Sequence, residues 1–236
     1  WGIDVTTHQR DGRLQAIDVP PGRPVGGDHQ IRADASSALF WATAAAIIPG
    51  SVITLPGVSL QDGQPDAAGI HTLASIGLQI NVHEDGICCT GPETLRSVDT
   101  IDCAQMPDAA PALAVACCWA NRPTRLTGLG TLRDKESDRV ATIAGELNRA
   151  GFAVQIEGDD LLVTPCHPEP TPVTVQTWDD HRIAMAMAIM GLRRGEVAIA
   201  DPAVTTKSYP GFWDDLGRLV GSGQTVRERS GTDRCR

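Results

Sequence analysis

The chain has 236 residues, enough to bury a core and to form one or two domains. Hydrophobic residues make up 42% of it and aromatic residues only 4%, which is ordinary for a soluble globular protein rich in small side chains. The formal net charge of −9 argues against general nucleic-acid binding, because that function needs a basic face. The longest apolar run, 38–48, is too short to span a bilayer and no signal peptide is visible, so we expect a cytoplasmic protein without a membrane partner.

Residues 1–31 alternate apolar and polar side chains, as strands do, and contain a Pro-Pro-Gly turn. The pattern differs from that of the remaining chain, and we interpret this segment as the end of a preceding domain and a hinge. The sequence begins with Trp1 rather than methionine, inside the strand pattern. We therefore expect the chain to be a fragment whose N-terminal part is missing.

From residue 32 the sequence repeats one pattern loosely, with a period of about 70 residues, over 32–100, 101–168 and 169–221. Each copy opens with an acidic or hydroxyl residue that can cap a small-residue helix. A short strand, a Gly or Pro turn and a second helix follow, and the first two copies end in a hairpin. The elements expected in chain order are helix 38–48, strand 51–55, helix 66–76 and hairpin 78–90; helix 111–120, strand 124–127, helix 135–150 and hairpin 153–164; helix 183–192, strand 196–200 and helix 209–220.

Such units predict an α/β domain with internal pseudo-symmetry. A closed three-fold arrangement suits the long period better than a solenoid. It would direct equivalent helix N-termini to one place, where their partial positive charges favour an anion. The polar, charged tail 222–236 is predicted to be disordered.

The cysteines give no sign of a metal site. There are seven, an odd number, and none forms a Cys-x-x-Cys pair. Adjacent pairs such as Cys88-Cys89 and Cys117-Cys118 suit neither chelation nor disulfides. We expect most of the cysteines to be reduced, buried, small apolar residues.

The most informative segment is 132–139, Leu-Arg-Asp-Lys-Glu-Ser-Asp-Arg, where charges of both signs follow a glycine-rich turn. If a helix starts near Asp134, Lys135 and Arg139 share a face at i and i+4. Glu136 then lies about 100° round the axis. Two cations beside a carboxylate suit an anionic substrate and a proton transfer. A solvated helix start laced with ion pairs accounts for the same residues equally well.

Several motifs together resemble one family. In chain order they are Asp34-x-Ser36-Ser37-Ala38, Gln64-x-Asp66, Pro107-Asp108-Ala109-Ala110, the segment 132–139, Asp180-His181-Arg182-x-Ala184-Met185 and Lys207-Ser208-x-Pro210. Their order and spacing over residues 1–220 resemble the 5-enolpyruvylshikimate-3-phosphate synthase family, also called 3-phosphoshikimate 1-carboxyvinyltransferases.

The resemblance implies an inside-out barrel of pseudo-threefold βαβαββ repeats, the enolpyruvyl transferase type, and a second similar domain that this chain lacks. It implies transfer of the enolpyruvyl group of phosphoenolpyruvate to the 5-hydroxyl of shikimate 3-phosphate, with release of phosphate, in aromatic amino acid biosynthesis. No metal or cofactor is expected. The full-length protein is expected to be a monomer, and the fragment alone to be inactive.

The resemblance also implies roles for single residues. Asp108 matches the acid that contacts the substrate hydroxyls and accepts a proton, and Glu136 matches the second acid–base residue. The remaining matches bind substrate: Lys135 on the shikimate phosphate side, Arg139, Arg182 and Lys207 at phosphoenolpyruvate, His181 close to them, and Thr131 where many members have an asparagine.

Bland interpretations remain open for the same residues. Asp108 could be a plain helix cap, Lys135 a surface lysine and His181 a structural histidine. The other cations could form ion pairs with Asp138, Asp180 or Asp214. We interpret Ser36, Ser37, Gln64 and Asp66 as caps and turn-formers rather than ligands.

Two other functions stay open. A transferase acting on UDP-N-acetylglucosamine belongs to the same superfamily, although the motifs at 135–139 and 181–185 argue against it. The other is a non-catalytic half-protein that binds anionic metabolites or docks with a separate partner.

Overall fold

The structure is a computed structural model that describes residues 2–28, 30–61 and 63–226. The chain divides into two compact units, and the boundary lies between Arg32 and Ala33. The two units are described separately below.

The first unit is a β-hairpin. Strands β1 (Thr6–Arg10) and β2 (Arg13–Asp18) pair antiparallel around Asp11 and Gly12, whose φ angles of 52° and 73° suit a two-residue hairpin turn. The strand pattern expected around Leu14 and Ile17 is therefore present. Leu14 and Ile17 are about half exposed, because two strands alone bury little apolar surface.

The second unit begins with a helix–strand–helix–hairpin segment. Helix α1 (Ala35–Ile47) is capped by Asp34, as expected. Strands β3 (Val52–Pro56), β4 (Gln79–His83) and β5 (Gly86–Thr90) form an antiparallel sheet in the order β3-β5-β4, and helix α2 (Ala67–Ser75) connects β3 to β4.

The next segment repeats this pattern. It comprises β6 (Thr100–Asp102), the 3-10 helix η1 (Pro107–Ala109), α3 (Ala110–Cys117), β7 (Thr124–Thr127), the 3-10 helix η2 (Gly130–Asp134), α4 (Arg139–Arg149), β8 (Ala153–Glu157) and β9 (Asp160–Thr164). Its sheet has the order β6-β7-β9-β8, and only β6 and β7 are parallel.

The last segment is shorter. Strands β10 (Val173–Val175) and β11 (Val197–Ile199) pair in parallel and flank α5 (His181–Arg194) in sequence. The 3-10 helix η3 (Pro202–Lys207) and α6 (Phe212–Val226) follow. Among the described residues, no helix is both long and apolar enough to cross a membrane.

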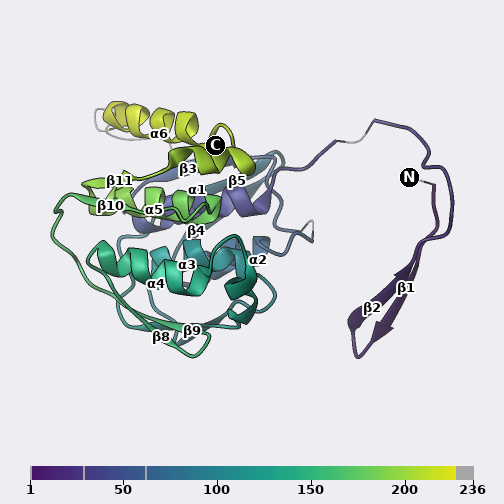
Figure 1. Cartoon of the computed structure of the whole chain (residues 1–236). Coiled ribbons are helices and arrows are strands. Elements are labelled where there is room, and N and C mark those ends of the chain that lie inside the picture. Colours follow the sequence, from purple (N-terminus) through teal and green to yellow (C-terminus); the bar gives the residue numbers. More distant parts are fainter. Residues whose placement is uncertain (1, 29, 62, 227–236) are drawn as a thin grey trace. The chain divides into compact units, whose positions relative to one another are not determined.

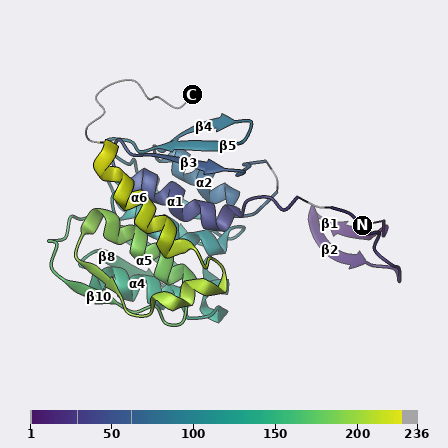
Figure 2. The ribbon, with the colours of Figure 1, turned by 90° about the horizontal axis from the view of Figure 1, so that it is seen from above.

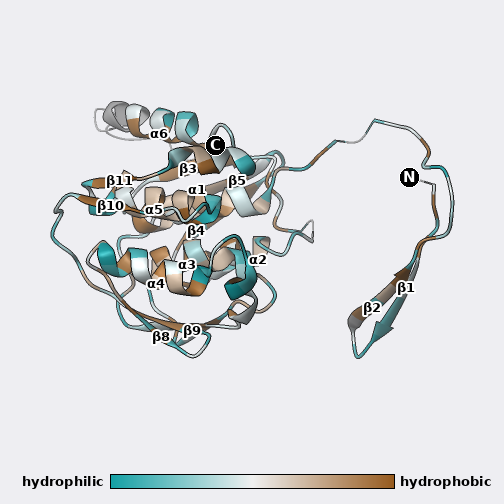
Figure 3. Cartoon of the chain, in the orientation of Figure 1, coloured by the Kyte–Doolittle hydropathy of each residue, from teal (hydrophilic) through white to brown (hydrophobic). Residues whose placement is uncertain are grey.

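Helices form the centre of this unit and sheets lie outside. Helices α1, α3 and α5 contact one another, and most of their residues are buried. Figures 1 and 2 show α1 beside α5, with β3-β5-β4 on one outer side and β8 and β9 on another. The alanine-rich sequences of these helices permit such central packing, because small side chains let the helix backbones approach one another. A helix that is apolar all round is stable only when it is buried. In contrast α4 carries both polar and apolar residues, as Figure 3 shows, and buries one face.

Three expectations from the sequence differ from the structure. The helix expected at 135–150 begins only at Arg139, because the Asp138 carboxylate accepts from Ala141 N–H and caps the helix there. Lys135 is extended, so Lys135 and Arg139 do not share a helix face. The last helix, expected to end at 220, continues to Val226 as α6 and so enters the tail 222–236 for which disorder was predicted. The rest of that tail lies outside the described residues.

The short strands β6 and β10 were not predicted. Each has three residues, too few to show an alternating pattern. The cysteine expectation fits Cys89, Cys103, Cys117 and Cys118, which are free and buried, and burial raises the pKa of each. Cys166 is free and only partly buried, and Cys88 is buried but disulfide-bonded, which differs from the expectation of a reduced thiol. Cys235 lies outside the described residues.

A pair of glycines tests the packing of this unit. A Cβ on Gly91 would collide with the carbonyl oxygens of Ala45 and Ile48 at the end of α1, whereas a Cβ on Gly145 in α4 would meet nothing. We expect Gly91→Ala to destabilise the fold by about 1–3 kcal/mol. Gly145→Ala should stabilise it by about 0.5–1 kcal/mol through helix propensity. Urea unfolding of both variants measures this, and a neutral Gly91→Ala would contradict the close approach.

Candidate active site

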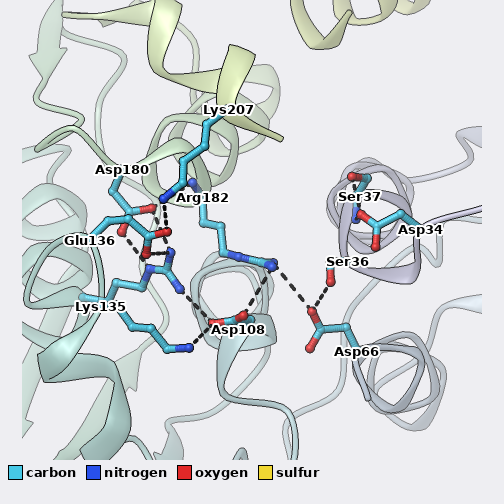
Figure 4. Close-up of polar contacts among 11 residues, drawn as sticks. Asp34, Ser36, Ser37, Asp66, Asp108, Lys135, Glu136, Asp180, Arg182 and Lys207 are labelled. Carbon is cyan, nitrogen blue, oxygen red and sulfur yellow. Dashed lines mark hydrogen bonds and ion pairs between the residues drawn. The ribbon is translucent and has the colours of Figure 1, made fainter. Parts of the chain in front are cut away.

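The residues singled out from the sequence lie mostly at the starts of helices. Asp108 lies in η1, Arg139 begins α4, and His181 and Arg182 begin α5. Lys135 and Glu136 lie in the short link between η2 and α4, and Lys207 ends η3. Figure 4 shows Asp108, Lys135, Glu136, Arg182 and Lys207 directed toward one another.

Arg139 is at the centre of this group. Its side chain is 1% exposed, and its guanidinium donates to three carboxylates. Nε and Nη2 donate to Asp180 at 2.7 and 3.2 Å, Nη1 donates to Asp108 at 2.8 Å, and Nη2 donates to Glu136 at 2.7 Å. Asp180 is fully buried, so this part of the site contains a buried, hydrogen-bonded ion pair.

Glu136 connects Arg139 to Lys207, whose ammonium donates to the other carboxylate oxygen. The hydrogen bond from Lys207 is the main reason that the pKa of Glu136 falls from 4.5 to about 2, and the charge of Arg139 adds to it. Glu136 is therefore an anion at neutral pH in this arrangement.

Asp108 is shared by three cations. Besides Arg139, Lys135 Nζ lies 3.3 Å and Arg182 Nη2 lies 3.3 Å from its oxygens. The capping position of η1 belongs to Met106. The carboxylate of Asp108 is thus directed to cations, and the plain-cap interpretation of Asp108 does not describe its contacts.

Arg182 extends the network to the first segment of this unit. Its Nη1 lies 3.6 Å from Asp66, whose carboxylate also accepts from the Ser36 hydroxyl. Burial raises the pKa of Asp66, while the Ser36 hydrogen bond and Arg182 oppose that rise. Asp66 makes no side-chain cap for α2, so the expectation that it is only a turn-former misses this contact.

Asp180 is the other residue whose part in the network was missed. Sequence reasoning treated it as a cap or a simple ion-pair partner. It does cap α5, accepting from Arg182 N–H at 2.9 Å, and it also accepts from the Ser137 hydroxyl at 3.0 Å and from Arg139. Asp66 and Asp180 each directly precede a helix, and this position was the sequence signal that could have pointed to them as site residues.

Two expected site residues lie outside these ion pairs. His181 is buried, and its Nδ1 has no hydrogen-bond partner in the described part of the chain. Burial lowers the pKa of His181, so the ring is neutral at pH 7. Thr131 is exposed in η2, and its side chain makes no hydrogen bond within the described residues.

The described network balances its charges. It contains the basic side chains Lys135, Arg139, Arg182 and Lys207 and the acidic side chains Asp66, Asp108, Glu136 and Asp180. An anionic ligand would find four cations already gathered, and it would compete with carboxylates for them. Two carboxylates beside the same cations could exchange protons with that ligand.

The ion pair between Lys207 and Glu136 gives a pH prediction. Above pH 4.5 Glu136 is ionised in both folded and unfolded chains, so its contribution to stability is fully present. As the pH falls toward 2, the unfolded chain takes up the proton first and that contribution is lost. Lys207→Ala should raise the pKa of Glu136 toward 4.5 and reduce this loss. Carboxyl carbon NMR measures the pKa, with Lys135→Ala as a control that leaves Glu136 unchanged; an unshifted pKa in Lys207→Ala would refute the contact.

The buried pair of Arg139 and Asp180 gives a stability prediction. Arg139→Met should cost about 3–5 kcal/mol, because it leaves the Asp180 charge buried with no cation. Adding Asp180→Asn should restore part of that loss. Arg133→Met, which breaks more exposed ion pairs with Asp138 and Asp159, should change stability little. Urea unfolding compares the variants, and equal effects of Arg139→Met and Arg133→Met would contradict the buried pair.

Comparison with known proteins identifies the family of this chain. The EPSP synthase family (3-phosphoshikimate 1-carboxyvinyltransferase) matches residues 1–216. A 3-phosphoshikimate 1-carboxyvinyltransferase from Syntrophobacter fumaroxidans is 36% identical over 219 residues, which are 92% of this chain and 50% of that protein. The chain therefore spans about half the length of this curated relative.

Solved structures show the same fold. EPSP synthase from Acinetobacter baumannii superposes with a TM-score of 0.76 at 27% identity, over 92% of this chain and 52% of that one. The enolpyruvyl transferase NikO from Streptomyces tendae, at 21% identity, gives 0.64 over 80% of this chain and 43% of its own, and shows the fold alone. The expected enolpyruvyl transferase fold is confirmed, and this chain belongs to the EPSP synthase family.

Proposed function

We propose that this chain carries acid–base and anion-binding residues of an enzyme that transfers the enolpyruvyl group of phosphoenolpyruvate to the 5-hydroxyl of shikimate 3-phosphate. Membership of the family supports the reaction. The observation that carries the proposal is the contact of Arg139 with both Asp108 and Glu136, because it puts the two expected acid–base residues on one cation.

The reaction needs two proton movements on each side of a tetrahedral intermediate. The hydroxyl oxygen bonds to C2 of phosphoenolpyruvate, its proton passes to a carboxylate, and C3 gains a proton. The C2–O bond to phosphate then breaks, the departing phosphate takes up the proton held by the first carboxylate, and C3 loses a proton, which leaves the enol ether and free phosphate. We assign the hydroxyl proton to Asp108 and the C3 proton to Glu136, with no metal or cofactor.

The resting contacts of Glu136 fit an acceptor better than a donor. A carboxylate with a pKa near 2 holds no proton at pH 7. We propose that the phosphate and carboxylate of phosphoenolpyruvate attract Lys207 and Arg139 away from Glu136, which removes the two interactions that lower its pKa. Glu136 could then carry the proton that C3 requires. Substrate binding would thus prepare the acid.

The cations take separate tasks in this proposal. Arg139, Arg182 and Lys207 bind phosphoenolpyruvate, since guanidinium forks suit carboxylate and phosphate oxygens. Lys135, which contacts the same oxygen of Asp108 as Arg139 does, is assigned to the phosphate of shikimate 3-phosphate. His181 and Thr131 are proposed as flanking contacts, His181 as a neutral hydrogen-bonding group.

Because the chain spans about half the length of its relatives, we propose that further residues of the family fold complete the site. Residues 1–236 alone should bind anions without turnover. The protein at the relatives' length is proposed to be a cytoplasmic monomer that needs no nucleic-acid or membrane partner.

Replacement of Asp108 tests the chemistry. In the protein at its relatives' length, Asp108→Asn should reduce phosphate release from the two substrates by about 10²–10⁴-fold, because the hydroxyl loses its proton acceptor. Asp99→Asn, a strongly exposed acid on the same segment, is the matched control and should be fully active. A parent that binds neither substrate would rule out the proposed function, and an Asp108→Asn variant as active as its parent would rule out the role of Asp108.

A further inference from the structure

A strained turn lies directly before the residues that Arg139 and Asp66 contact. Trp178 and Asp179 both have positive φ angles, 55° and 58°, and the next residues are Asp180, His181 and Arg182. A bulky residue such as tryptophan rarely adopts this left-handed conformation. It costs on the order of 1–3 kcal/mol and persists only where surrounding contacts enforce it.

The contacts that enforce the turn converge on Glu146. This carboxylate lies on α4 and is buried, with 1% of the residue exposed. It accepts from the backbone N–H of Gln176 at 2.9 Å and from the indole Nε1–H of Trp178 at 3.0 Å. The cation beside it, Arg149, donates at 3.1 Å but has a half-exposed side chain. A buried carboxylate depends on such donors, so Glu146 and the turn stabilise each other.

Helix α4 therefore holds the turn at two points. Arg139 and Glu146 are seven residues apart, two helical turns, and so lie on one face. Arg139 binds the carboxylate of Asp180, and Glu146 binds the chain just before it. Asp180 in turn caps the backbone N–H of Arg182. A shift of the turn would move both Asp180 and the start of the helix that carries Arg182.

We propose that Glu146 is a positioning residue of the anion site: by holding Gln176 and Trp178 it keeps Asp180 and Arg182 where an anionic substrate needs them. Glu146 is buried and both of its carboxylate oxygens already accept hydrogen bonds from protein groups, so it acts through these residues rather than on substrate. The importance of the site rests on the proposed function, whereas the effect of Glu146 on the turn does not.

The test is Glu146→Gln, which keeps the size of the side chain but loses the charge and one acceptor oxygen. Glu157→Gln on β8, which breaks a more exposed ion pair with Arg125, is the matched control. Residue-resolved amide hydrogen exchange measures the turn, and calorimetric titration of phosphoenolpyruvate measures the site.

In Glu146→Gln we expect exchange protection to fall at 176–182 while central α3 keeps its protection, and affinity for phosphoenolpyruvate to fall about 10- to 100-fold. Glu157→Gln should change neither. Adding Asp179→Gly to Glu146→Gln should restore part of both, because glycine adopts a positive φ without strain. Such a rescue is not expected of a residue that only stabilises the core.

Two outcomes would overturn the proposal. One is unchanged exchange at 176–182 in Glu146→Gln. The other is an equal loss of protection throughout the second unit, which would make Glu146 an ordinary core residue. If the parent binds no phosphoenolpyruvate, the proposed function fails, yet the exchange measurement still decides whether Glu146 holds the turn.

Discussion

The guanidinium of Arg139 is the interaction on which the site and much of the fold depend. It is buried and joins carboxylates from three parts of the chain: Asp108 before α3, Glu136 before α4 and Asp180 before α5. A buried charge without partners would cost several kcal/mol, so these helix starts must stay together for the cation to be tolerated. A planar fork with several donors can meet all three acceptors, and a lysine ammonium, being a point charge, could not do so with the same geometry.

The balanced charge of the network has a consequence for binding. Without ligand, the cations are held in place by carboxylates such as Asp108 and Glu136. This arrangement keeps the cations gathered without uncompensated repulsion. An incoming anion then gains only the difference between its own contacts and those it displaces, which favours ligands carrying several negative groups. The displaced carboxylates lose the cations that kept them ionised, so anion binding and proton uptake become coupled.

Local sequence patterns predicted the helices and strands whose caps and periodicity lie within the element itself. They failed where contacts with distant residues determine the structure. The small-residue helices behind Asp34 and Asp180 are found within a few residues of their observed bounds, and the strand at 124–127 is found as observed. Lys135 and Glu136 have good helix propensity but lie outside the helices, where they form ion pairs with Asp108 and Lys207. The family motifs identified most of the charged cluster. The bond between Asp180 and Arg139 spans 41 residues, and no local pattern reveals a partner at that distance.

The sequence alone leaves open whether an acidic residue at a helix start caps that helix or belongs to the charged site. In this fold the same carboxylate can do both. Helix starts from different repeats meet at one place, so a carboxylate there is near other helix starts as well as its own. The carboxylate of Asp34 accepts hydrogen bonds from the backbone N–H and the hydroxyl of Ser37 in its own helix. The carboxylates of Asp66 and Asp108 form no cap on their own helices and contact Arg182 instead. Asp180 both caps its own helix and binds Arg139. The acidic residue at the start of a helix, which recurs in each repeat, thus becomes part of a charged cluster because these helix starts lie together. The direction of each carboxylate decides whether it caps its helix or contacts the cations of the site.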